Sequence, residues 1–360
     1  MLVLGIETTC DETSCAVVRS GSEILSNVVA SQAELHSLYG GVVPELSCRQ
    51  HVDQLLPVLR KCLEESAVSL HALDLIAVAH APGLIGALLL GLNGAKALSM
   101  ALKKPFVGVN HVEAHLYAAL MFSDSPIDYP CLGVVASGGH TALWLTEEVG
   151  RYQLLGQTID DAAGEAFDKV ARMMGLPYPG GPHIERLARR GDPRRFPLHA
   201  GSVKEAPFSF SFSGIKTAAL YSWRSFLASQ AITPQAITSQ AHSLPTPSLS
   251  EGTTTISEEE GRCDLAASFQ EAILGDIAEK MRRAVQKYPV RHIAVGGGVS
   301  SNQRFREICR ERVPNHHWHW PRASLGLDNG AMIAGLGYHV YNRHGPSSFD
   351  LQPQTRLPLC

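Results

Sequence analysis

Two histidines lie four residues apart in the segment "VNHVEAHLYA", residues 109–118. Positions i and i+4 share one face of a helix, so His111 and His115 could hold one metal ion between their imidazoles. Catalytic zinc and iron sites usually add a third protein ligand and leave one position open for water or substrate. The chain has 16 histidines, so such a pair also arises by chance, with His111 as a helix cap and His115 as a core residue.

The glutamate between the two histidines does not fit the zinc-protease motif. In H-E-x-x-H the catalytic glutamate directly follows the first histidine, whereas Glu113 stands two residues after His111. Two residues turn a helix by about 200°, so Glu113 points away from the face that would carry the metal. A peptidase would therefore lack its general base here.

Two glycine-rich turns have the composition of sites for phosphate or carboxylate groups. "VVASGGHTA" places Ser137 and two glycines between apolar segments, where backbone N–H groups can bind an anion. A plain tight hairpin is the alternative. "HIAVGGGVSSNQRF" leads from a strand through three glycines to a helix that begins near Asn302, as in anion and nucleotide sites. It matches neither the Rossmann nor the Walker pattern.

Acidic side chains recur where helices are expected to begin. Asp160 and Asp161 precede a helix predicted near 161–175, and both are natural caps at its positive end. Asp168 lies two turns further on, where it could bind a ribose hydroxyl or pair with a nearby cation. Asp328 opens a later helix, either as its N-cap or as the missing third metal ligand.

Five arginines follow the turn "YPGGP": Arg186, Arg189, Arg190, Arg194 and Arg195. Such a cluster suits the phosphates of a nucleic acid. A solvated basic helix end is the alternative. The net charge of −3 argues against a protein with basic side chains over its whole surface.

The predicted elements occur twice in the same order. Three strands joined by turns are followed by alternating helices and strands, and the pattern begins again near residue 131. We expect single strands at 2–7, 15–19, 23–31, 73–80, 105–109, 151–159 and 292–297, and two strands joined by a glycine turn over 131–148. Helices are expected at 43–67, 83–104, 161–175, 182–190, 214–228, 264–288 and from about 300, and in the segment that carries His111 and His115. The repetition predicts an α/β protein of two duplicated lobes with a central cleft. Ligands should bind where loops leave the carboxyl ends of strands.

The domain boundaries follow from this order. Lobe I is predicted to comprise 1–110 plus 325–345, and lobe II 111–324 with the glycine-rich loops. Residues 228–261, rich in Ser, Thr, Pro and Gln, are expected to form a flexible insertion in lobe II. Residues 346–360 are expected to be an irregular tail.

The composition is that of a globular cytoplasmic protein. Apolar residues make up 45% and charged residues 18% of the 360-residue chain. No apolar segment free of polar residues reaches the ~18 residues that span a bilayer, and no signal or transit peptide is recognisable. The eight cysteines include no C-x-x-C pair. We therefore expect reduced cysteines and no membrane association.

Eight segments, in order from about residue 2 to 340, resemble one family. They are "GIETTCDETSCAVV", "GGVVPELSCRQH", "NHVEAH", "ASGGHTALW", "DDAAGEAFDKVARMMGLPYPGGP", "FSFSGIKTA", "GGGVSSNQRFRE" and "DNGAMIA". Together they resemble the TsaD family of tRNA N6-threonylcarbamoyladenosine synthases, once described as O-sialoglycoprotein endopeptidases. The resemblance implies the fold of the actin, sugar-kinase and chaperone-ATPase (ASKHA) superfamily.

The resemblance also implies roles for individual residues. His111, His115 and Asp328 would hold one divalent metal, iron (Fe²⁺) first and zinc as the alternative. Asp11 and Glu12 match acidic catalytic positions at the mouth of the cleft. The adenylate-binding positions would be Val135, Ala136, Ser137, Gly138, Gly139, Asp168, Gly181, Glu185 and Asn302.

The implied reaction moves the threonylcarbamoyl group of threonylcarbamoyl-AMP to N6 of adenosine 37 in tRNAs that read ANN codons, and releases AMP. The family works with a TsaB-type paralogue, a TsaE-type ATPase and a TsaC-type enzyme that makes the adenylate. Two other functions are considered: a metal-dependent glycoprotein endopeptidase, and a non-catalytic nucleotide-binding scaffold. The scaffold should lack the two histidines and the aspartate, all of which this chain has.

Overall fold

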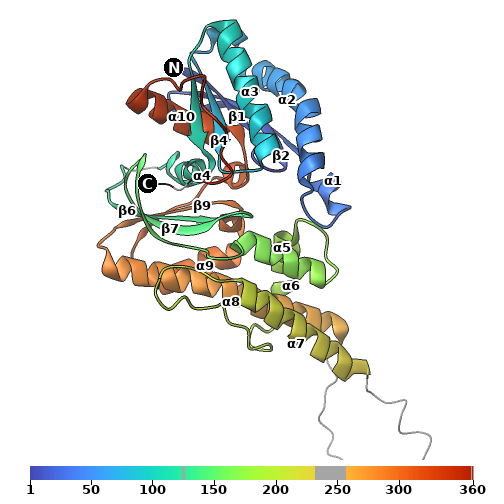
Figure 1. Ribbon diagram of the computed structural model, residues 1–360. Coiled ribbons are helices and arrows are strands. Elements are labelled where there is room, and N and C mark those ends of the chain that lie inside the picture. The colour runs from blue at the N-terminus through green and yellow to red at the C-terminus, as the bar shows by residue number, and fades with distance from the viewer. Residues whose placement is uncertain (124–125, 232–256, 358, 360) are drawn as a thin grey trace, which may run out of the picture.

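Two similar sheets stand one above the other in Figure 1. This computed structural model describes residues 1–123, 126–231, 257–357 and 359. The described residues form two five-stranded sheets. Most of the insertion predicted at 228–261 lies outside the described residues.

The first sheet has the strand order β3-β2-β1-β4-β5. Its first three strands are antiparallel neighbours, and β4 and β5 run parallel to β1. All of β4 is buried, as expected for a parallel strand covered on both faces. The strands are β1 (Leu2–Glu7), β2 (Glu12–Arg19), β3 (Glu23–Ser31), β4 (Leu75–Ala81) and β5 (Phe106–Asn110).

The second sheet repeats this topology with the order β10-β9-β6-β7-β8. Again three antiparallel strands come first, and β9 and β10 run parallel to β6. The predicted duplication of α/β lobes is thus confirmed, although the short edge strand β10 was not expected. The strands are β6 (Cys131–Ala136), β7 (Thr141–Glu148), β8 (Arg151–Gln157), β9 (His292–Gly296) and β10 (His317–His319).

Helices cover both faces of the first sheet. Helices α2 (Pro44–Ser66) and α3 (Ile85–Leu102) pack on one face, and α10 (Gly330–His344) packs on the other. By length and composition α3 could cross a membrane, with a mean hydropathy of 1.5. One face of α3 packs on the first sheet, with Leu92 and Ala95 in the core beneath β4, and 33% of the helix is buried in all.

The second sheet carries a larger helical layer. Its core joins β6, β7 and β9 to buried aromatic and aliphatic side chains of five helices. Figure 1 shows these helices below the sheet, with α5 and α6 beside the gap between the lobes. They are α5 (Ala163–Met173), α6 (Gly180–Ala188), α7 (Ser213–Ala231), α8 (Glu258–Lys287) and α9 (Gln303–Arg312).

Helix α4 (His111–Leu120) lies between the two sheets and is buried along its whole length. Ala114, Tyr117 and Ala118 pack in the core of the first sheet, whereas Leu116 and Ala119 pack with strands of the second. The residues that α4 carries are therefore fixed by both lobes.

The last described residues form no helix or strand but pack on the first lobe. Lys96 Nζ donates to the carbonyl oxygen of Leu351 at 2.7 Å, and the N–H of Gly108 donates to Ser347 Oγ at 3.0 Å. The rings of Phe106 and Phe349 lie 5.3 Å apart. These contacts tie the irregular end of the chain to α3 and to the outer strand β5.

Candidate active site

The histidine pair begins helix α4 where β5 ends. Asn110 caps this helix, because its side-chain oxygen accepts hydrogen bonds from the N–H groups of Val112 and Glu113. His111 is therefore not the cap. Both imidazoles are buried, and their ring centroids lie 4.6 Å apart.

Asp328 joins the two histidines from the loop before α10. Its Oδ1 lies 3.0 Å from His115 Nε2 and 3.6 Å from His111 Nε2. One ligand atom from each of the three residues falls within 4.8 Å of the others. Asn329 caps α10 by accepting from Met332 N–H, so the capping alternative for Asp328 is wrong.

His115 has a nitrogen that fits a ligand position. Both of its ring nitrogens are buried and lack a well-aligned hydrogen bond in the described part of the chain, although Asp328 Oδ1 lies 3.0 Å from Nε2. A buried ring nitrogen without a well-aligned partner costs free energy, and a metal ion bound at Nε2 would offset that cost for this nitrogen. Two imidazoles and one carboxylate are the donor set of zinc and non-haem iron sites, so the residues fit such an ion.

Glu7 is a site residue that we did not predict from sequence. Its fully buried carboxylate accepts a hydrogen bond from His111 Nδ1 at 2.9 Å, which leaves His111 Nε2 facing Asp328. Burial lowers the pKa of His111, but the charges of Glu7 and Asp328 raise it to about 9 in the metal-free protein. A carboxylate that orients a ligating histidine is a common feature of metal sites.

Further carboxylates gather beside these ligands. Asp11 lies in the turn between β1 and β2, and Glu12 is the first residue of β2. Burial raises the pKa of Glu12, and the charges of Asp328 and Asp11 raise it further. Several carboxylates close together in a region of low exposure repel one another, and a bound cation would relieve this repulsion.

Glu113 lies away from the ligand atoms, as predicted. Its Oε1 accepts a hydrogen bond from the Tyr152 hydroxyl at 2.8 Å, on the side of α4 that faces the second sheet. It has no geometry for activating a water molecule between the histidines and Asp328.

The β6–β7 turn lies next to the metal-ligand cluster. Ser137 N–H donates to the His140 carbonyl oxygen and His140 N–H donates to Ser137 Oγ, so the segment is a tight hairpin. Burial and the charges of His111 and His115 lower the pKa of His140 to about 4. His140 is a second neighbour of the site that we did not predict.

Two glycines of this hairpin are open to solvent. A Cβ atom built at Gly138 or Gly139 would meet nothing within 4 Å, so a ligand can reach the backbone there. By contrast, a Cβ on Gly297 would lie 2.5 Å from the carbonyl oxygen of Ala136, because the two glycine loops touch. Val135 and Ala136 are fully buried, so only their backbone could contact a ligand.

The other predicted adenylate positions surround the same loops. Asp168 Oδ1 accepts from Gly180 N–H at 2.7 Å; burial raises the pKa of Asp168 to about 6 although this bond opposes the shift. Gly181 is open to solvent. Glu185 accepts a hydrogen bond from the N–H of Gln303, and Asn302 caps α9 by accepting from the N–H of Phe305. These two backbone N–H groups at the start of α9 are therefore already bonded within the protein.

The arginine cluster is largely neutralised. Arg189 pairs with Glu185, Arg190 with Glu259, and Arg194 with Asp192. The alternative of a solvated basic helix end thus accounts for most of this segment.

Comparison with known sequences decides the family. A profile described as "TsaD: tRNA N6-adenosine threonylcarbamoyltransferase" matches residues 23–335. The chain belongs to the TsaD family. A tRNA N6-adenosine threonylcarbamoyltransferase of Protochlamydia amoebophila is 53% identical over 360 residues, which are 100% of this chain and 98% of the relative. One from Symbiobacterium thermophilum is 43% identical over 99% of this chain and 97% of its own length.

Solved structures show the same fold as this TsaD chain. HypF in its phosphate- and nucleotide-bound form matches with a TM-score of 0.58 over 96% of this chain and 47% of HypF, at 9% identity. Component A of the Acidaminococcus fermentans (R)-2-hydroxyglutaryl-CoA dehydratase matches with a TM-score of 0.51, over 95% of this chain and 98% of component A, at 12% identity. The predicted ASKHA-type fold is confirmed.

Family membership also answers the question of activity. TsaD proteins transfer a threonylcarbamoyl group to N6 of a tRNA adenosine, and tRNA is therefore a substrate of this chain. The endopeptidase and scaffold alternatives are not favoured.

Proposed function

We propose that this chain transfers the threonylcarbamoyl group of threonylcarbamoyl-AMP to adenosine 37 of tRNAs that read ANN codons, in the cytoplasm. We further propose that His111, His115 and Asp328 hold one divalent metal, iron as Fe²⁺ with zinc as the alternative. The supporting observation is the cluster of two buried histidines and Asp328, in which Asp328 Oδ1 lies 3.0 Å from His115 Nε2 without a well-aligned hydrogen bond.

The residues around the cluster suggest how the reaction proceeds. A cation bound there would supply Lewis acidity toward the carbonyl or the threonyl and phosphate oxygens. The backbone of Gly138 and Gly139, which no protein side chain covers, would bind the adenylate and hold AMP as the leaving group. N6 attacks the carbamoyl carbonyl carbon, a C–N bond forms, the C–O bond to the AMP phosphate breaks, and Asp11 or Glu12 accepts the proton that N6 loses.

A reconstituted reaction tests this function. Threonylcarbamoyl-AMP, tRNA and the chain are combined with its partner proteins, and nucleosides are analysed by mass spectrometry. We expect threonylcarbamoyladenosine at position 37 only in ANN-reading tRNAs, together with one AMP per transfer. Modification of other tRNAs to the same extent, or AMP release without transfer, would contradict the proposal.

Gly138→Val is expected to weaken adenylate binding by about 10- to 100-fold, because the new side chain fills the open space above the hairpin. Stability should hardly change, since no protein atom lies within 4 Å of the new Cβ. Gly214→Val is the matched control, because Gly214 is equally open at the start of α7. Calorimetric titration with a non-hydrolysable adenylate and thermal unfolding measure both effects. Equal affinity in the two variants would refute the adenylate site.

Glu7→Gln is expected to lower metal affinity by about 10- to 100-fold, because an amide orients His111 less strongly than a carboxylate does. Glu113→Gln is the control, since this buried glutamate lies on α4 between the two histidines but accepts its hydrogen bond from Tyr152. Competition with a chromogenic chelator measures the affinity. Unchanged affinity in Glu7→Gln would show that this carboxylate does not support a metal ligand.

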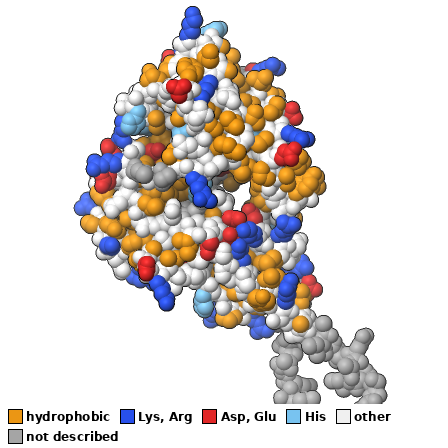
Figure 2. Space-filling model, in the orientation of Figure 1, with side chains coloured by type: hydrophobic (Ala, Val, Ile, Leu, Met, Phe, Trp, Pro, Cys, Tyr) orange, Lys and Arg blue, Asp and Glu red, His pale blue; other side chains and the backbone are white. Residues whose placement is uncertain are grey.

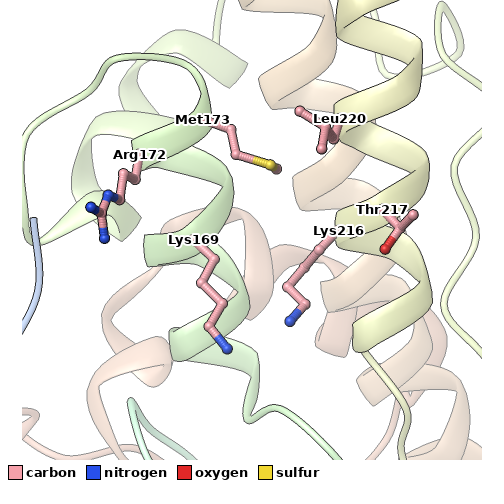
Figure 3. Close-up of a pocket in the computed structure, with 6 residues that line it drawn as sticks. All are labelled: Lys169, Arg172, Met173, Lys216, Thr217 and Leu220. Atoms are coloured by element: carbon pink, nitrogen blue, oxygen red, sulfur yellow. The ribbon is translucent and has the colours of Figure 1, made fainter.

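A groove between α5 and α7 supports a site for the tRNA backbone. It is lined by the cations Lys169, Arg172 and Lys216 and by an apolar floor, and Figure 3 shows both lysines directed to the same side. Asp161 contacts both lysines, whereas Arg172 has no ion pair in the described chain. Arg172 lies against Gly40 of the first lobe, at the edge of the cleft. We assign the groove to phosphates that flank adenosine 37.

Arg172→Ala should therefore weaken tRNA binding several-fold and reduce the slope of log K against log salt by about one. Arg310→Ala removes an exposed arginine at the far end of α9 and should leave the tRNA affinity and the salt slope unchanged. Filter binding at several salt concentrations measures the slope. If the two variants have equal slopes, the tRNA lies elsewhere.

Exposed apolar side chains on the first lobe support a protein partner. Val52 and Leu56 on α2 and Ile85 and Leu89 on α3 are each at least 40% exposed and stand one helical turn apart in pairs. Figure 2 shows hydrophobic side chains gathered over this upper part of the molecule. We propose that the TsaB-type paralogue docks here. We further propose that a TsaE-type ATPase and a TsaC-type adenylate-forming enzyme complete the system.

A further inference from the structure

A hydrogen bond joins the two lobes at the mouth of the cleft. The hydroxyl of Tyr178 donates to Asp11 Oδ2 at 3.1 Å. Tyr178 belongs to the loop between α5 and α6 in the second lobe, whereas Asp11 belongs to the β1–β2 turn of the first. The two residues are 167 positions apart in sequence, so the bond depends on how the lobes are placed.

The loop that carries Tyr178 is held firmly by the second lobe. Asp168 on α5 accepts a hydrogen bond from Gly180 N–H, two residues after Tyr178. Gly180 also packs so tightly that a Cβ there would lie 2.3 Å from Ala171 Cβ. The phenol is therefore presented to the first lobe from a fixed base, and that base includes the predicted adenylate residue Asp168.

The environment keeps the Tyr178 hydroxyl a donor. Burial raises its pKa, and the neighbouring carboxylates of Asp11 and Asp168 raise it further. A protonated phenol beside a carboxylate donates a charge-assisted hydrogen bond. Asp11 is then held through Oδ2 from the opposite lobe, while its carboxylate also interacts with its neighbours Cys10 and Glu12.

We propose that Tyr178 is a positioning residue for threonylcarbamoyl transfer. It orients the Asp11 carboxylate when the lobes are closed, and so couples the adenylate-binding side of the cleft to the acidic turn on the other side. The inference rests on the proposed catalytic role of Asp11. Tyr178 itself exchanges no proton with the substrate in this scheme.

The kinetics of Tyr178→Phe test whether this hydroxyl contributes to threonylcarbamoyl transfer. The variant keeps the ring and removes only the hydroxyl. We expect kcat to fall about 10-fold, the effect of one lost hydrogen bond, with the KM for the adenylate changed less than about 2-fold. In an Asp11→Asn background the same change should have no further effect. Tyr221→Phe, at an exposed tyrosine of α7, is the control. Full activity of Tyr178→Phe, or additive losses in the double variant, would overturn the proposal.

A spectroscopic readout separates the bond from the catalytic role of Asp11. The chain has nine tyrosines, so the ¹³Cζ signals of labelled protein can be assigned with the Phe variants. The Tyr178 signal should shift in Asp11→Asn and stay in place in Glu113→Gln. A Tyr178 signal unmoved by Asp11→Asn shows that the cross-lobe bond is absent, which overturns the inference. A shifted signal with a fully active Asp11→Asn would instead show that the proposed role of Asp11 is wrong, and with it the positioning role of Tyr178.

Discussion

Asp328→Ala is expected to lower kcat/KM for threonylcarbamoyl transfer by at least about 100-fold and to abolish stoichiometric metal binding. Asp328 is the one ligand of the cluster outside α4, and it lies within 3.6 Å of both imidazoles. Without it, two histidines on one helix remain, which is too few ligands for a tight site.

The fold of this variant should survive. Asn329, not Asp328, caps α10, and in the described part of the chain the Asp328 side chain pairs with the two histidines and not with the backbone. Asp350→Ala, which removes an exposed carboxylate in the tail, is the control. Transfer is followed by nucleoside mass spectrometry, metal content by elemental analysis and folding by thermal denaturation. Wild-type transfer in a folded Asp328→Ala protein would refute a catalytic metal at this cluster.

Gly330→Ala is expected to destabilise the chain by about 3 kcal/mol, the second large effect. The new Cβ would lie 2.6 Å from the backbone nitrogen of Ala16 and 2.8 Å from the carbonyl carbon of Cys15. These are backbone atoms, so no side chain can turn away. Helix α10 must therefore move off β2, and the hydrogen bond from Gly330 N–H to Ser14 Oγ is strained.

The same displacement should weaken metal binding, because Asp328 stands two residues before Gly330. Gly326→Ala is the matched control: its Cβ would meet the Ser301 hydroxyl at 2.7 Å, and that side chain can rotate. Its cost should stay below about 1 kcal/mol. Urea unfolding measures both free energies. Equal stability of the two variants would mean that α10 is not packed on the sheet as described.

The repeated order of strands and helices could be predicted from sequence, because apolar periodicity is local information. The predicted boundaries differ from the observed ones by a few residues. β2 begins at Glu12 rather than residue 15, since its polar first residues still pair with β3. The edge strand β10 was not predicted, because "HWH" is too short to show a period.

The site could be predicted only in part, because some of its residues meet through contacts between distant parts of the chain. The i, i+4 spacing on α4 suggested His111 and His115, and motif resemblance suggested Asp328. Glu7 is 104 residues from His111, and nothing in its local sequence indicates that the end of β1 faces the start of α4. The choice between a capping and a ligating Asp328 also needed the structure, which gives the cap to Asn329.

The most direct test of the central claim is a parallel titration of metal binding and transfer. Metal-free protein is titrated with Fe²⁺ without oxygen, and bound metal and threonylcarbamoyladenosine are measured in the same samples. We expect one equivalent per chain, a transfer rate proportional to occupancy, and neither binding nor transfer in a His115→Ala, Asp328→Ala double variant. Full transfer by metal-free wild type, or one bound equivalent in the double variant, would contradict the proposed role of His111, His115 and Asp328.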